Sequence, residues 1–96
     1  MGVMSREQKA GLARLMLIWP EGRAAVRSMA MSDAILLELC ECYELACGAA
    51  DFWSKSNSFG SAVIANEYTA ILTELEHEIR HRVIRPPACK VSEFAR

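Results

Sequence analysis

Residues 77–81 read His-Glu-Ile-Arg-His, which has the H-E-x-x-H spacing of helical zinc sites. On a helix the two histidines lie one turn apart on the same face, so that both can bind one zinc ion. The glutamate between them can take a proton from a metal-bound water. The pattern therefore predicts a zinc-dependent hydrolase with His77 and His81 as metal ligands and Glu78 as the base.

The surroundings of this motif favour a different interpretation. The chain has only two histidines, so a carboxylate or Cys89 would have to supply the third ligand. The apolar residues of the same segment gather around one direction on a helix, and both histidines point roughly 140–180° away from it. They are Ile64, Tyr68, Ile71, Leu72, Leu75 and Ile79. We therefore expect exposed histidines, no cofactor and no enzymatic activity, with the zinc hydrolase as the alternative.

Charges in the same segment fit a solvated helix face. Glu76 with Arg80, and Glu78 with Arg82, have the i, i+4 spacing of favourable ion pairs on one helix. The arginines also complement the negative end of the helix dipole. These residues are thus predicted to pair with each other along the surface.

The elements that carry these residues are all predicted to be α-helices. Ser5 followed by Gln8 forms a capping box, and Pro20 suits the first turn of a new helix. Ser32 with Asp33 opens a long helix, and Pro86 ends the last one. We expect one domain over residues 1–96, with two short N-terminal helices followed by a long antiparallel helical hairpin. The expected helices cover residues 5–19, 20–29, 32–54 and 61–85, with a tail over 86–96.

The helix over 32–54 carries more apolar surface than one partner helix covers. Most of its apolar residues form one broad stripe that we assign to the core. They are Ile35, Leu36, Leu39, Cys42, Tyr43, Ala46, Ala50 and Trp53. Leu37, Leu45 and Phe52 fall outside that stripe and are predicted to form an oligomer interface. The alternative is a bundle in which the N-terminal helices cover these residues.

Charge is distributed unevenly along a chain whose net charge is −1. Residues 31–79 hold nine acidic residues against Lys55 alone, and both ends are basic. Such basic ends bind nucleic acid or the acidic middle of another subunit, and ordinary solvated faces are the alternative. The predicted DNA-binding residues are Arg6, Lys9, Arg14, Arg23 and Arg27.

Composition points to a cytoplasmic location. No apolar run approaches the roughly 18 residues that a membrane span needs, so no membrane partner is expected. Cys40 and Cys42 point about 200° apart on a helix and cannot chelate one ion. Reduced cysteines in core or boundary positions are typical of cytoplasmic proteins.

One family resemblance covers about half of the chain. The run from Leu36 to Ala46, then Trp53, then Glu67-Tyr68 through Leu75-Glu76 and Arg85-Pro86, resembles the helical part of small terminase subunits of phages and gene-transfer particles. The resemblance implies a ring-forming, non-catalytic subunit that holds DNA and engages the large terminase. Residues 1–31 contain no recognisable helix-turn-helix reader, so any DNA contact would be electrostatic, non-specific and dependent on salt.

These observations together predict a non-enzymatic helical assembly or adaptor module. Its expected partners are further copies of itself, another protein and non-specific DNA, and its most concrete form is a small-terminase-like DNA-packaging subunit. Two alternatives stay open at this point. One is the H-E-x-x-H zinc hydrolase, and the other is a small inhibitor that docks on a host protein.

Overall fold

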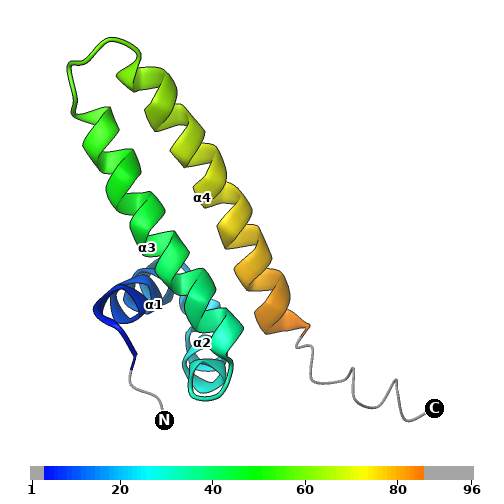
Figure 1. Ribbon diagram of the computed structural model, residues 1–96. Coiled ribbons are helices and arrows are strands. Elements are labelled where there is room, and N and C mark those ends of the chain that lie inside the picture. Colours follow the sequence, from blue (N-terminus) through cyan, green and yellow to red (C-terminus); the bar gives the residue numbers. More distant parts are fainter. Residues whose placement is uncertain (1–3, 86–96) are drawn as a thin grey trace.

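The computed structural model describes residues 4–85, and every regular element in this part of the chain is a helix (Figure 1). Helix α1 spans Arg6–Ile18, a 3-10 turn η1 spans Pro20–Gly22, and helix α2 spans Arg23–Ala30. Helices α3 (Ala34–Ser54) and α4 (Ser61–Ile84) form a long antiparallel hairpin. The predicted all-α fold, with two short N-terminal helices before a hairpin, is confirmed.

Local signals set the helix boundaries. The Ser5 hydroxyl accepts from the Gln8 backbone N–H, and the Gln8 side chain accepts from the Ser5 N–H, which completes the predicted capping box. Pro20 begins the 3-10 turn, so α2 itself starts three residues later than expected. Asp33 caps α3 by accepting from the backbone N–H groups of Ile35 and Leu36. Gly60 has a φ of +81° and turns the chain into α4.

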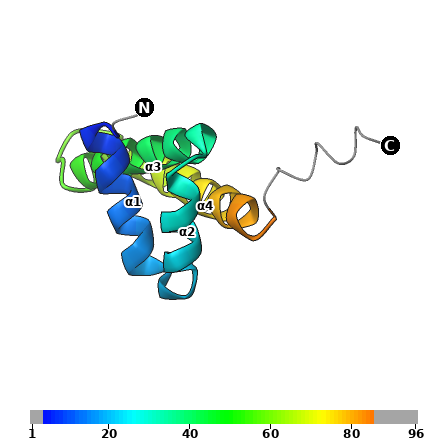
Figure 2. The same ribbon diagram turned by 90° about the horizontal axis from the view of Figure 1, so that it is seen from below.

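Helices α1 and α2 both lie on one side of the α3/α4 hairpin (Figure 2). Helix α1 approaches α3 closely through Gly11, where a Cβ atom would stand 2.0 Å from the carbonyl oxygen of Cys40. Only glycine permits this backbone contact, because any side chain would overlap that oxygen. Gly11 therefore fixes where α1 crosses α3.

The hydrophobic core gathers where α1 and α2 meet the hairpin. Leu15, Val26, Leu36 and Ile79 are its most deeply buried large side chains. Partly buried residues, Trp19 among them, pack around this cluster. The loop-side half of the hairpin buries much less, and its buried positions are small residues such as Ala46 and Ala65. One half of the hairpin, which we call the base, thus packs against α1 and α2, and the other half is α3 against α4 alone.

The burial pattern of α3 corrects the predicted core stripe. Ile35 and Cys42 were expected inside, yet both are exposed. Leu37, which was expected outside the stripe, packs against the core. The reason is that α1 joins α4 in covering α3, which shifts the covered face toward Leu37 and away from Cys42.

Across residues 4–85, none of the helices has the length and apolar character that a bilayer span requires.

Candidate functional site

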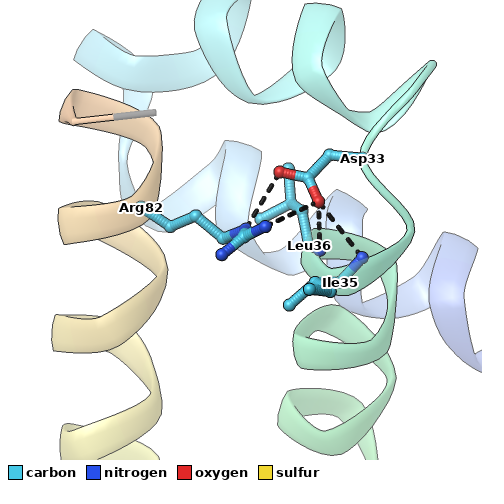
Figure 3. A network of polar contacts seen from close by, with 4 residues as sticks. All are labelled: Asp33, Ile35, Leu36 and Arg82. Carbon is cyan, nitrogen blue, oxygen red and sulfur yellow. Dashed lines mark hydrogen bonds and ion pairs between the residues drawn. The ribbon is translucent and has the colours of Figure 1, made fainter. Parts of the chain in front are cut away.

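An ion pair holds the two ends of the hairpin together and so positions α4 (Figure 3). Arg82 donates to both carboxylate oxygens of Asp33, at 2.9 and 3.1 Å, while Asp33 also caps α3. Burial alone raises the pKa of Asp33, but the hydrogen bond from Arg82 and those from the backbone outweigh it, and the net pKa is lowered. The carboxylate is therefore stabilised in its charged form.

Two further contacts orient α4 against its neighbours. The Tyr43 hydroxyl donates to Glu76 at 2.7 Å, and burial together with this carboxylate raises the pKa of Tyr43. The Arg80 guanidinium lies over the Trp19 ring, 5.2 Å from its centroid. The predicted pairs of Glu76 with Arg80 and of Glu78 with Arg82 are absent among the ion pairs of residues 4–85. That prediction was wrong because Glu76, Arg80 and Arg82 contact Tyr43, Trp19 and Asp33 across the fold instead.

The H-E-x-x-H residues lie on the outer surface of α4. His77 and His81 are exposed, as predicted, and line an open depression together with Thr73, Glu74 and Glu78. Within the described range no group of three His, Cys, Asp or Glu side chains is placed to hold a metal ion. Cys89, considered as a third ligand, lies outside that range. The depression thus offers two imidazoles and two carboxylates from a single helix, with no ligand from elsewhere in residues 4–85.

The predicted DNA-binding residues divide into two groups. Arg14 forms an ion pair with Glu44, and this hydrogen bond raises the pKa of Arg14. Arg23 donates to the main-chain carbonyl of Met16 at 3.1 and 3.2 Å. The remaining three, Arg6, Lys9 and Arg27, are exposed and form no ion pair within residues 4–85. Their charges are therefore available on the surfaces of α1 and α2.

A row of side chains along α3, which we call the outer stripe, includes several of the exposed large apolar residues. Its positions are separated alternately by three and four residues, the spacing of a coiled-coil heptad. They are Ile35, Glu38, Cys42, Leu45, Ala49 and Phe52. Ile35, Leu45 and Phe52 are 52%, 57% and 63% exposed, and only Glu38 carries a charge. A helix with such a row can accept a second helix along its length.

Helix geometry places the outer stripe away from both neighbours of α3. Tyr43 faces α4, and Glu44, about 100° further round, faces Arg14 of α1. Cys42 lies about 100° in the opposite sense, and Leu45 and Phe52 point roughly 160–180° from Tyr43. In Figure 2, α1 begins beside α3, where Gln8 donates to Glu41, and both α1 and α2 then extend away from the hairpin in one direction. Residues 4–85 therefore leave most of the stripe uncovered, although Ala49 is half-buried.

The uncovered surface continues onto α4. Ile79 is buried and faces α3, and the next residue, Arg80, turns toward Trp19. Ile71, which is 43% exposed, lies about 80° from Ile79 in the opposite sense. It therefore borders the same open side of the hairpin as the stripe.

Comparisons with known proteins give no relative. No protein-family model, curated protein or solved structure matches this chain. The case for function therefore depends on the surfaces described above.

The predicted interface residues differ in their surroundings. Leu45 and Phe52 are exposed members of the outer stripe, whereas Leu37 packs against the core. The full stripe was missed because a second heptad row lies one residue further along the helix and was merged with it. That inner row comprises Leu36, Leu39, Tyr43, Ala46, Ala50 and Trp53. Reading the two heptad registers separately would have found the outer stripe.

Proposed function

We propose that this protein is a non-enzymatic assembly module whose α3 helix associates with a second copy of the chain through the outer stripe. The observation that carries the proposal is a heptad-spaced row in which Ile35, Leu45 and Phe52 are more than half exposed, on a helix whose opposite faces are already packed. Single exposed apolar residues are ordinary on protein surfaces, but an uncovered heptad row is typical of helices that pair.

The energetic scale is adequate for association of moderate strength. Full burial of a side chain such as Leu45 or Phe52 stabilises a complex by about 1.5–3 kcal/mol. Two chains lose about 4–15 kcal/mol of translational and rotational freedom when they associate. Two side chains alone do not offset that loss. Ile35, Leu45 and Phe52 of two copies make six such side chains, and burying their exposed parts reaches the lower part of that range.

Light scattering of the purified chain at tens of micromolar tests this proposal. We expect a mass above that of the monomer, and a strict monomer would overturn the proposal. Leu45→Lys should shift the mass toward the monomer. Leu17→Lys is the matched control, because Leu17 is 74% exposed but lies on α1. If the chain is monomeric, the inhibitor hypothesis, in which the stripe meets a host protein, becomes the better account.

A more specific version of the proposal is a small-terminase-like packaging subunit that binds DNA non-specifically in the cytoplasm. The sequence resemblance supports it, and so do the exposed charges of Arg6, Lys9 and Arg27. Binding should weaken steeply with salt, because phosphate contacts release counterions. The triple variant Arg6→Glu, Lys9→Glu and Arg27→Glu should lose binding, and an absence of binding by the wild type at low salt would contradict this version.

The H-E-x-x-H motif keeps the zinc hydrolase as a second candidate. Elemental analysis of protein purified without chelators tests it directly. Stoichiometric zinc that disappears in both His77→Ala and His81→Ala would favour the hydrolase over the assembly module. Zinc at trace levels in all three proteins would leave the motif as a surface feature of α4.

A further inference from the structure

We infer that the loop-side end of the hairpin is a hinged arm, which opens as a unit while the base stays folded. The arm comprises residues 49–68, which form the last part of α3, the connecting loop and the first part of α4. Figure 1 shows this end of the hairpin projecting beyond α1 and α2. The hinge lies where the arm joins the base, at Gly48 of α3 and at Thr69 and Thr73 of α4.

The arm is held by much less buried apolar surface than the base. Leu36 and Ile79, the large side chains that the hairpin buries completely, both lie in the base. In residues 49–68 only Ser61 and Ala65 are buried, and neither is a large apolar residue. Because apolar burial is the main stabilising contribution, opening the arm costs less free energy than unfolding the base.

Side-chain polar contacts between α3 and α4 also stop short of the arm. The one nearest to it is the hydrogen bond from the Tyr43 hydroxyl to Glu76, at 2.7 Å. Side-chain hydrogen bonds within the arm stay in one helix or reach the adjoining loop, as from the Ser61 hydroxyl to the Ser56 carbonyl. The arm can therefore open without breaking a side-chain hydrogen bond between the two helices.

Gly48 marks the hinge on α3, just beyond this last hydrogen bond. It follows Tyr43 by five residues and lies inside the helix, where glycine is less stable than alanine. Counting the same five residues back from Glu76 on the antiparallel α4 gives Ile71. Gly48 and Ile71 therefore lie at about the same level of the hairpin.

Two threonines mark the hinge on α4 at that level. Thr69 and Thr73 stand on either side of Ile71, and each hydroxyl donates to the carbonyl oxygen four residues earlier, at 3.0 and 3.2 Å. Such bonds compete with the helix's own hydrogen bonds and favour bending. Both helices thus carry a feature that weakens them at the boundary between arm and base.

Opening of the arm changes the apolar surface that the molecule presents. The outer stripe crosses the hinge, with Leu45 on the base and Phe52 on the arm. Phe59 and Val63, which are also exposed, lie on the arm, and Trp53 is half-buried between its helices. The arm is therefore a conformational device that moves one set of apolar contacts relative to the base and uncovers another. It operates within one molecule and needs no second copy.

Hydrogen exchange of the full chain, read by mass spectrometry of peptides at low micromolar concentration, tests the arm. Helical amides of residues 49–68 should have protection factors roughly tenfold or more below those of residues 36–43 and 76–83, because local opening costs less than global unfolding. Equal protection of arm and base would overturn the inference.

Two variants locate the boundary of the opening unit. Ile79→Val removes one methyl group from the base and should speed exchange of the base roughly two- to tenfold while the arm is unchanged. Gly48→Ala should slow exchange of the arm roughly two- to fivefold, the ratio set by helix propensity. If Ile79→Val speeds both regions equally, the chain is one cooperative unit and the arm does not exist. If Gly48→Ala leaves exchange of the arm unchanged, the hinge is overturned.

Discussion

Helix α3 carries two heptad rows that differ by one residue in register and have opposite surroundings. The inner row packs against α4 and includes the buried residues Leu36, Tyr43 and Ala46. The outer stripe has the same spacing, yet Ile35, Leu45 and Phe52 are more than half exposed. The difference shows that spacing alone does not determine burial. One row has its partner within the chain, whereas residues 4–85 leave the other mostly exposed, and it is this second row that we propose to associate with another copy.

Gly11 on α1 and Gly48 on α3 also differ in what surrounds them. Gly11 of α1 is required by a backbone contact with Cys40, so its role is complete within one chain. Gly48 of α3 touches nothing that a side chain would displace. Gly48 therefore lowers the helix propensity of α3 without meeting a packing requirement within residues 4–85.

The largest expected effect on stability comes from replacing Gly11, the glycine of the packed base. Gly11→Ala would place its Cβ 2.0 Å from the Cys40 carbonyl oxygen, which forces α1 away from α3. We expect the free energy of unfolding to fall by more than about 3 kcal/mol, in the range of severe overpacking. Urea unfolding followed by circular dichroism measures this loss. A loss below about 1 kcal/mol would mean that α1 does not depend on this contact.

The next largest effect concerns Asp33, which caps α3 and joins the two ends of the hairpin through Arg82. Asp33→Ala removes a helix cap and leaves the half-buried Arg82 without its carboxylate, and we expect a loss of about 2–3 kcal/mol. Because the folded pKa of Asp33 lies below its ordinary value of 3.8, its contribution is complete above that pH. The contribution disappears as the pH falls through the lower folded pKa.

Urea unfolding of both proteins between pH 7 and pH 2 checks the Asp33 prediction. The difference in stability between wild type and Asp33→Ala should be constant above about pH 5 and shrink in more acidic solution. A difference that stays unchanged down to pH 2 would contradict the assigned role of the charged carboxylate.

A charge in the outer stripe should affect assembly and leave the monomer fold intact. Leu45→Lys should weaken self-association at least tenfold, which corresponds to about 1.4 kcal/mol. The unfolding free energy of the monomer should change by less than about 0.5 kcal/mol, because Leu45 contributes little to the core. Sedimentation velocity over a concentration series measures the first quantity. Equal weakening by Leu17→Lys would show that the effect is not specific to the stripe.

The smallest expected effect is that of Gly48→Ala. Alanine should stabilise the isolated chain by about 0.5–1 kcal/mol, because α3 gains helix propensity and the new methyl group meets open space. Association should weaken at the same time if a second α3 passes close to this position. A variant that is more stable and also associates as well as the wild type would remove Gly48 from the interface.

Much of the fold follows from local signals. The capping box at Ser5, the cap at Asp33 and the loop before Ser61 place three of the helices within two residues of their observed ends. Exposure of His77 and His81 follows from the periodicity of α4 alone. These features depend on residues close together in sequence, and helical spacing describes such residues well.

The contacts between helices could not be predicted in the same way. Arg82 has both Glu78 and Asp33 within reach, and only the packing of α4 beside the start of α3 decides between them. Likewise, helical spacing does not reveal that α1 covers Leu37 and leaves Cys42 exposed. That outcome depends on Gly11, whose importance appears only when two backbones meet.

Light scattering on the wild-type chain and on Leu45→Lys, each at tens of micromolar, tests the central claim most directly. We predict that the wild type has a mass above that of its 10.7 kDa monomer and that Leu45→Lys moves toward the monomer. A wild type that stays monomeric throughout this range would contradict it.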